Sequence, residues 1–141
     1  MNANLRDITL QPLAACVAAL VCAFPLHAAA DPVDDLLQQY KAQGASNFSA
    51  AAGQQFWDKP FPAEKGEARR CNLCHSDDLK RVGKHAVTGK AIEPLAPSVN
   101  PERLADRAKI EKWLLRNCKW TTGRECTPQE KGDVLVMIKS K

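Results

Sequence analysis

The pentapeptide Cys71-Asn72-Leu73-Cys74-His75 decides how the rest of this sequence is interpreted. It has the Cys-x-x-Cys-His spacing of a covalent haem attachment site. Two thiols three positions apart can reach both vinyl groups of one porphyrin, and the adjacent imidazole is then presented to the iron. A neutral histidine is a good ligand for either oxidation state of iron. The motif therefore predicts one covalent haem c, bonded to Cys71 and Cys74 and ligated on its proximal side by His75.

Two other uses of closely spaced cysteines each lack a necessary part. A redox-active dithiol is expected next to a strand-helix-strand unit, and the sequence around Cys71 does not indicate one. A structural zinc site needs a second close pair of ligands. Cys118 and Cys126 are eight positions apart and do not supply that pair. Haem attachment is the interpretation that uses every residue of the motif.

The N-terminal segment has the three-part layout of a secretory signal peptide. An apolar run of twelve residues, 13–24, is followed by the small-residue ending Ala28-Ala29-Ala30, so cleavage is expected before Asp31. The run is shorter than the eighteen or more residues expected of a membrane span. A lipoprotein alternative rests on Cys16, but the lipobox-like residues stand at the start of the apolar run instead of after it. Residues 1–30 are therefore predicted to be a cleaved signal peptide.

The predicted mature chain, residues 31–141, is long enough for one small domain and too short for two. The removed segment contains one basic and one acidic residue, so the net charge stays at +4. A moderately basic exported protein is more plausibly attracted to an acidic protein partner than to nucleic acid, although ordinary solubility charge explains the balance equally well. We expect no nucleic-acid partner and no transmembrane segment in the mature chain.

The mature sequence is predicted to be all-α, a small helical domain around one covalently bound haem. An amphipathic helix follows the capping residue Asp31, and a second short helix covers 50–57. From 82 to 101 glycines and prolines recur without a period, which predicts a long ordered loop. A third helix follows Asp106, and the last begins with the capping box TPQE from Thr127.

The motif does not assign the second axial position of the iron. Small electron-carrying cytochromes commonly use methionine there, because the thioether raises the reduction potential. The mature chain has one methionine, Met137, inside the last predicted helix, where it is expected to fill the core. The mature chain has one further imidazole, that of His85 in the long loop. His85 is therefore an alternative distal ligand, and an exposed loop position is its other interpretation.

Two cysteines of the mature chain lie outside the motif. The simplest use of Cys118 and Cys126 is a disulfide that closes residues 119–125 into a small loop and fixes the backbone beside Asn117. Two free thiols in an oxidising compartment are the alternative. In the chain-entropy description, a loop this short contributes about 2 to 3 kcal/mol to stability.

From Cys71 onward the sequence resembles the oxygen-binding class I cytochromes c of the sphaeroides haem protein type. A weaker match runs through Gly53 and Trp57. The resemblance implies a class I cytochrome c fold, in which the N-terminal and C-terminal helices cross and the haem edge lies in a crevice. The residues that carry it are CNLCH from Cys71, TGKAIEPLAPSVNPERL from Thr88, KIEKWLLRNC from Lys109 and GRECTPQEK from Gly123.

The resemblance also implies a distal ligand. In that family the asparagine of the Arg-Asn-Cys segment binds the iron, which corresponds to Asn117 here, and the adjoining cysteines, here Cys118 and Cys126, form a disulfide. An amide oxygen is a weak neutral ligand that suits ferric iron better than ferrous, so reduction is expected to free the site. Without the resemblance, such an asparagine would be interpreted as a helix C-cap. A bis-histidine resting state with His85 stays the alternative.

These observations together predict a periplasmic monohaem cytochrome that accepts electrons and binds O2, NO or CO at its iron. The resemblance suggests a dihaem cytochrome c and a membrane b-type cytochrome as electron partners, and Lys80, Lys84 and Lys112 could form the docking face. The first alternative is a plain six-coordinate electron carrier. A peroxidase or a nitric oxide detoxifying enzyme would need acid-base groups over the distal face, and His85 is the one obvious candidate. We therefore favour a binding and redox role and assign no catalytic residue.

Overall fold

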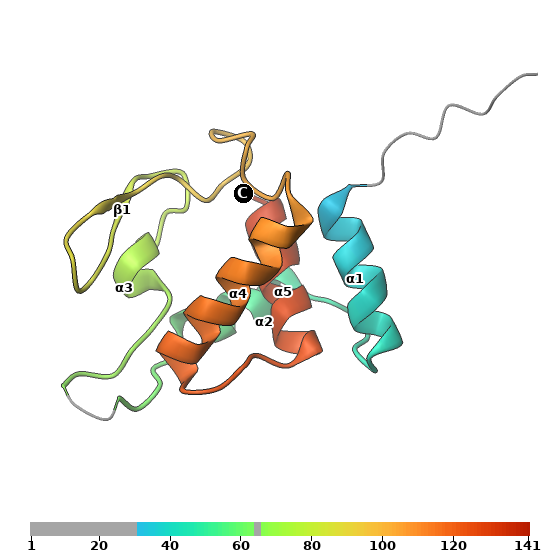
Figure 1. Ribbon diagram of the computed structural model, residues 1–141, viewed down its shortest axis with the longest axis horizontal. Helices are drawn as coiled ribbons and strands as arrows, with labels where there is room; N and C mark the ends of the chain where they lie inside the picture. The colour runs from blue at the N-terminus through green and yellow to red at the C-terminus, as the bar shows by residue number, and fades with distance from the viewer. Residues whose placement is uncertain (1–30, 64–65) are drawn as a thin grey trace, which may run out of the picture.

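The computed structural model describes residues 31–63 and 66–141. The predicted signal peptide, with Cys16 of the lipoprotein alternative, lies outside the described residues. Figure 1 shows α4 and α5 in the middle of the molecule, with α1 on one side and α3 and the β-hairpin on the other. The elements of the described part are α1 (Pro32–Ala42), α2 (Ala50–Asp58), α3 (Asn72–His75), β1 (Gly83–Lys84), β2 (Ala91–Ile92), α4 (Arg107–Thr122) and α5 (Pro128–Lys139).

The last helix, α5, forms the centre of the core. Leu135 packs with α1 residues and Ile110 of α4 in one buried cluster, while Met137 packs with Trp57 of α2 in a second. Met137 is 1% exposed, so the prediction that it fills the core is confirmed. The second cluster also brings in the loop after α3, through Leu79 and Ala96, and thereby positions that loop against α2 and α5.

Helix α2 crosses α5 at very close range, and Gly53 makes the crossing possible. A Cβ atom at this position would collide with the backbone carbonyl of Asp133 and with the Met137 side chain. Buried Asp133 also accepts a hydrogen bond of 2.7 Å from the backbone N–H of Ser49, at the start of α2. Because a buried carboxylate needs hydrogen-bond donors, this contact holds the start of α2 beside α5.

The helix caps expected from the sequence are present. Asp31 accepts a hydrogen bond of 2.8 Å from the N–H of Val33, and Asp106 accepts one of 2.9 Å from that of Lys109. Thr127 begins α5 with the predicted capping box. Each cap satisfies a backbone donor that has no partner within its own helix, which is why these helices begin where they do.

The segment predicted as a long loop contains a short hairpin, and this part of the prediction was wrong in detail. Strand β1 pairs antiparallel with β2, with Gly83 opposite Ile92 and Lys84 opposite Ala91. Each strand has two residues, too few for alternation between polar and apolar residues to be recognised. The remaining elements are helical, in agreement with the all-α fold class. Within the residues that the structure describes, no helix combines the length and the apolar character needed to cross a membrane.

Candidate haem-binding site

The Cys-x-x-Cys-His motif forms a single helical turn. Cys71 immediately precedes α3, and both Cys74 and His75 lie in it, with their N–H groups 3.3 Å from the carbonyl oxygen of Cys71. The N–H of Cys71 in turn donates to the carbonyl of Trp57, at the end of α2. The turn presents two free thiols and one imidazole from five consecutive residues, anchored on the core helix α2.

The hairpin packs directly against this turn. Gly83 lies so close that a Cβ atom there would collide with the carbonyl oxygen of Cys74 and approach the Cα of His75 to 3.1 Å. The backbone N–H of Ala86 donates to the Sγ of Cys74 at 3.3 Å. Backbone groups of Gly83 and Ala86 therefore contact Cys74. Because the backbone moves less than a side chain, these contacts hold Cys74 firmly in position.

His75 is held in an environment that keeps its ring neutral. Its imidazole lies beside the indole of buried Trp57, with ring centroids 5.4 Å apart. Burial, and then electrostatic interaction with Arg103 and His85, lower the pKa of His75 to about 4. Neutral imidazole is the form that binds iron, so His75 is ready to act as a ligand at neutral pH.

Arg103 is itself fixed close to this site. Its guanidinium donates to the carbonyl oxygens of Pro94 and Glu93 at 2.9 and 3.0 Å. Because these acceptors are backbone groups, the guanidinium is held in place, and its positive charge helps to lower the pKa of His75. Sequence reasoning did not single out Arg103 or Gly83, since neither belongs to a motif and both act through contacts distant in sequence.

Asn117, the expected distal ligand, lies within α4 and not at its end. The helix continues to Thr122 and is capped by Gly123, so the C-cap interpretation of Asn117 does not apply. The residue is exposed, and its side-chain amide makes no hydrogen bond to any other residue in the described ranges. Burial raises the pKa of the Cys71 thiol to about 12, and the side chain of Thr121, one turn further along α4, acts in the opposite direction. The face of α4 that carries Asn117 therefore continues toward the attachment motif.

His85, the alternative distal ligand, lies in the turn of the hairpin. Its Nδ1 atom accepts hydrogen bonds from the backbone N–H groups of Val87 and Thr88, at 3.3 and 3.1 Å. It is exposed, as its other interpretation expects. These hydrogen bonds use one of its two ring nitrogens and keep the ring on the hairpin that supports Cys74. The structure thus places His85 with the attachment motif and Asn117 on another element, α4.

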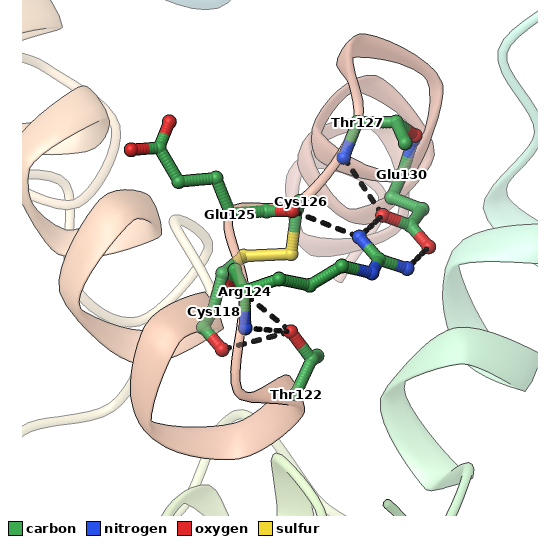
Figure 2. The surroundings of a disulfide bond; sticks show 7 residues. All are labelled: Cys118, Thr122, Arg124, Glu125, Cys126, Thr127 and Glu130. Atoms are coloured by element: carbon green, nitrogen blue, oxygen red, sulfur yellow. Dashed lines mark hydrogen bonds and ion pairs between the residues drawn. A yellow bond between two sulfur atoms is a disulfide. The ribbon is translucent and has the colours of Figure 1, made fainter.

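A disulfide joins the end of α4 to the residue before the cap of α5, as Figure 2 shows. It links Cys118 and Cys126, the pairing that the sequence favours, with Cα atoms 5.6 Å apart. Arg124 also stabilises the connection between α4 and α5. Its guanidinium donates two hydrogen bonds to Glu130, at 2.7 and 2.8 Å. Glu130 also accepts from the N–H of Thr127 at 2.7 Å, so the capping box and the disulfide form one structure.

Arg69 makes a second connection to α4, which the sequence analysis did not identify. Its Nη1 donates to the carbonyl oxygen of Trp120 at 2.6 Å, and its Cζ lies 4.6 Å from the centre of the Trp120 ring. The backbone of Arg69 is paired in both directions with that of Phe61. No motif or periodicity links an arginine before Cys71 to a tryptophan near the end of α4.

The residues present fit a covalent haem. Cys71 and Cys74 supply thiols for two thioether bonds, and His75 supplies a neutral imidazole. Large apolar side chains are uncovered in α3 and α4, with Leu73 and Trp113 each 47% exposed, and they provide the apolar surface that a porphyrin would cover. Buried Trp57 Nε1, beside His75, lacks a hydrogen-bond partner among the described residues. A bare metal ion fits less well, because the described residues contain no group of three or more His, Cys, Asp or Glu that could hold one.

Comparisons with known proteins point to the same cofactor class. A family model described as a domain of unknown function, DUF1924, matches residues 43–138. The cytochrome c-type protein SHP of Cereibacter sphaeroides is 40% identical over 103 residues, which are 73% of this chain and 79% of that protein. Cytochrome c'' of Methylophilus methylotrophus is 36% identical over 90 residues, 64% of this chain and 62% of that protein.

Solved structures of the same two proteins are also similar. The structure of oxidised SHP, described as an oxygen-binding cytochrome c, matches with a TM-score of 0.71 and 38% identity, over 77% of this chain and 96% of that one. The crystal structure of oxidised cytochrome c'' from Methylophilus methylotrophus matches with a TM-score of 0.69 and 30% identity, over 78% of this chain and 94% of that one. Both the sequence and the arrangement of the helices are thus those of small c-type cytochromes.

Proposed function

This chain belongs to the DUF1924 family and is a c-type cytochrome with covalent haem c, and from that premise we propose that it binds a small diatomic ligand and accepts electrons. When bound, haem c supplies a redox-active iron with two axial positions, one of which can exchange its ligand for O2, NO or CO. In this proposal His75 holds the proximal position and Asn117 occupies the distal position until it is displaced. The oxygen binding described for SHP is consistent with this role.

The observation that carries the proposal is the contrast between the two candidate ligands. His75 sits in a turn held by backbone contacts from Trp57 and Gly83. The amide of Asn117 has no hydrogen bond to another described residue, so nothing in the described part of the protein competes with its leaving or rebinding. An amide oxygen is also a weaker ligand for ferrous iron than an imidazole. Asn117 is therefore suited to give way to an incoming ligand.

The disulfide is part of the same proposal. Cys118 follows Asn117 directly, so its bond to Cys126 fixes the backbone next to the distal residue. We infer that the disulfide keeps α4 in place while the Asn117 side chain moves. A ligand that leaves by rotation of its side chain can return without refolding of the helix.

Absorption spectra of the holoprotein test this function. The oxidised and the reduced protein are each measured with and without carbon monoxide. We expect reduction to give a high-spin spectrum that shifts on addition of carbon monoxide, because Asn117 is displaced. A low-spin spectrum in both states that does not respond to carbon monoxide would contradict ligand binding and would indicate the plain electron carrier.

We further propose that the protein is exported to the periplasm and that residues 1–30 are removed. The support is the sequence layout of this segment, together with a haem attachment motif and a cysteine pair that suit an oxidising compartment. Mass spectrometry of protein purified from the native host gives the mature N-terminus. A chain that begins at Asp31 is expected, and a retained segment would contradict the proposal.

Electron partners are proposed to bind at the hairpin. From 79 to 92 the chain has no acidic residue, and the cations there form no ion pair with any described residue. The hairpin also contacts the Sγ of Cys74 through Ala86, which gives electrons a short covalent and hydrogen-bonded route. The proposed partners are a dihaem cytochrome c and a membrane b-type cytochrome, and an acidic surface on such a partner would complement the hairpin. The unpaired cations are Lys80, Arg81, Lys84 and Lys90.

Charge reversal tests the docking surface with a small anionic oxidant. We expect Lys84→Glu to slow oxidation of the ferrous protein by hexacyanoferrate(III) severalfold at low salt, and the difference to shrink as salt screens the charges. Lys41→Glu, on α1, is the control for net charge and should have a smaller effect. Equal effects of the two substitutions would contradict a docking role for the hairpin. Lys112, the other residue expected from the sequence, is exposed on α4 and is tested in the same way.

A further inference from the structure

Arg69 donates a hydrogen bond to a backbone carbonyl group near the end of α4, the helix that carries Asn117. Helix α4 ends at Thr122, so the carbonyl oxygen of Trp120 is one of the last four, which have no partner within the helix. The guanidinium of Arg69 donates to this oxygen at 2.6 Å and lies over the Trp120 ring. A cation near a helix C-terminus also interacts favourably with the helix dipole. The contact thus combines a charged hydrogen bond, a cation-π interaction and a helix cap.

The contact joins the segment before the haem attachment motif, which contains Arg69, to the helix that carries Asn117, which contains Trp120. Arg69 precedes Cys71 by two residues, and its backbone is paired with Phe61 through hydrogen bonds of 2.8 and 2.9 Å. Trp120 follows Asn117 by three residues, which is about one helical turn. A movement of the last turns of α4 relative to the attachment motif must therefore stretch or break the contact between Arg69 and Trp120.

The disulfide restrains the same helix through a different element. It connects Cys118 to the start of α5 and so fixes α4 relative to the core helix. Arg69 instead connects α4 to the segment that leads into the haem attachment motif. The distance between His75 and Asn117 therefore depends on the contact of Arg69 as well as on the core.

We propose that Arg69 is a positioning residue that sets how readily Asn117 is displaced from the iron. This inference rests on the proposed function. With the contact intact, the last turns of α4 hold the amide of Asn117 at the distal position. Without it, the helix end moves more freely, Asn117 occupies the position for a smaller fraction of the time, and an external ligand enters faster.

The central test is the rate of carbon monoxide binding to the reduced holoprotein. We expect Arg69→Gln to increase the association rate about tenfold, the change that corresponds to loss of one charged hydrogen bond. The ferric electron paramagnetic resonance spectrum should change at the same time, because the distal ligand is held less uniformly. Arg70→Gln is the matched control: Arg70 is the next residue, exposed and equally charged, and makes no side-chain hydrogen bond or ion pair with the described residues.

Two more variants keep the test decisive. Arg69→Lys keeps a charged donor and should shift the rate in the same direction by a smaller factor, which covers the case that Arg69→Gln does not mature. In an Asn117→Ala background, Arg69→Gln should cause no further change in the rate. Additive effects of the two substitutions would show that Arg69 does not act through Asn117 and would overturn the inference.

The outcomes separate the inference from the proposed function. If Asn117→Ala leaves the ferric spectrum unchanged, the proposed distal ligand is wrong. If Asn117→Ala changes that spectrum and neither Arg69 variant alters the spectrum or the binding rate, the inference alone is overturned. A lower melting temperature of the Arg69 variants with an unchanged rate and spectrum would assign Arg69 a purely structural role and would also overturn it.

Discussion

The two sides of the candidate haem site are built differently. The attachment side, defined as α3 and the hairpin, is held by backbone contacts, with Gly83 against Cys74 and the N–H of Ala86 on the Cys74 sulfur. The distal side, defined as residues 113–122 of α4, presents exposed Asn117, and its neighbours Cys118 and Trp120 connect the helix to Cys126 and to Arg69. The difference indicates that one axial ligand is fixed by the fold, whereas the other is free to leave while its helix stays in place.

The largest effect is expected from removal of an attachment cysteine. Cys74→Ala removes one covalent haem bond and the sulfur that accepts the N–H of Ala86. Maturation should largely fail, because attachment through both thiols is what the motif provides. The yield of covalently haem-stained protein after denaturing electrophoresis measures this effect. Normal yield with intact covalent haem would contradict the assignment of Cys74.

Loss of the disulfide should weaken the distal side and leave the attachment side intact. In the double variant Cys118→Ser, Cys126→Ser, the free energy of unfolding should fall by about 2 to 3 kcal/mol. Chemical denaturation of the holoprotein measures the change. A reductant should destabilise the natural protein and have no effect on the variant, which serves as the control. An unchanged denaturation midpoint in the variant would contradict a stabilising role for the bond.

Gly83→Ala is the corresponding change on the attachment side. The added methyl group would collide with the carbonyl of Cys74, and overpacking of this kind costs about 1 to 3 kcal/mol. The reduction potential should shift as well, because α3 moves relative to its support. Val87→Ala, at a 73% exposed position in the turn of the same hairpin, is the control for a substitution in this segment. Equal stability of the two variants would show that the close packing of Gly83 against α3 does not matter for the fold.

The smallest effect is expected at the capping box beside the disulfide. The Arg124 guanidinium lowers the pKa of Glu130 below its ordinary value near 4.5, against the opposing effect of burial. Because the folded state binds this proton more weakly than the unfolded state, Glu130 stabilises the fold above pH 4.5, and this contribution is lost as the pH falls through the lowered pKa. Glu130→Gln should therefore cost about 1 kcal/mol at neutral pH and less in acid.

The control for this prediction is the exposed ion pair next to it. Glu125 lies 3.2 Å from Lys119, and both side chains are 57% exposed, so Glu125→Gln should have little effect at any pH. Thermal unfolding of both variants at neutral and acid pH measures the difference. A loss of stability in Glu130→Gln that did not depend on pH would contradict the ionised state of Glu130.

The sequence predicted those features whose causes are local. The caps at Asp31, Asp106 and Thr127 and the core position of Met137 follow from residue preference and helical spacing, and the structure confirms them. The attachment motif was recognisable because its chemistry requires a fixed spacing. The hairpin was not, because two-residue strands leave no pattern.

The contacts that connect the two sides could not be predicted from the sequence. Arg69 and Trp120 are separated by 51 positions, and their contact depends on how α4 packs near the attachment motif. Asn117 carries no signal for iron binding of its own, since residue preference alone would make it a helix C-cap and the structure shows it as an exposed residue within α4. Its proposed role was recognised through the family resemblance, and the structure adds its position within α4 and its lack of hydrogen bonds to the described residues.

The most direct test of the difference between the two sides is the ferric electron paramagnetic resonance spectrum of Asn117→Ala, measured beside that of His85→Ala. We predict that Asn117→Ala alters the spectrum and speeds carbon monoxide binding to the reduced protein, whereas His85→Ala leaves both unchanged. An altered spectrum in His85→Ala together with an unchanged one in Asn117→Ala would contradict the account and would make the hairpin histidine the distal ligand.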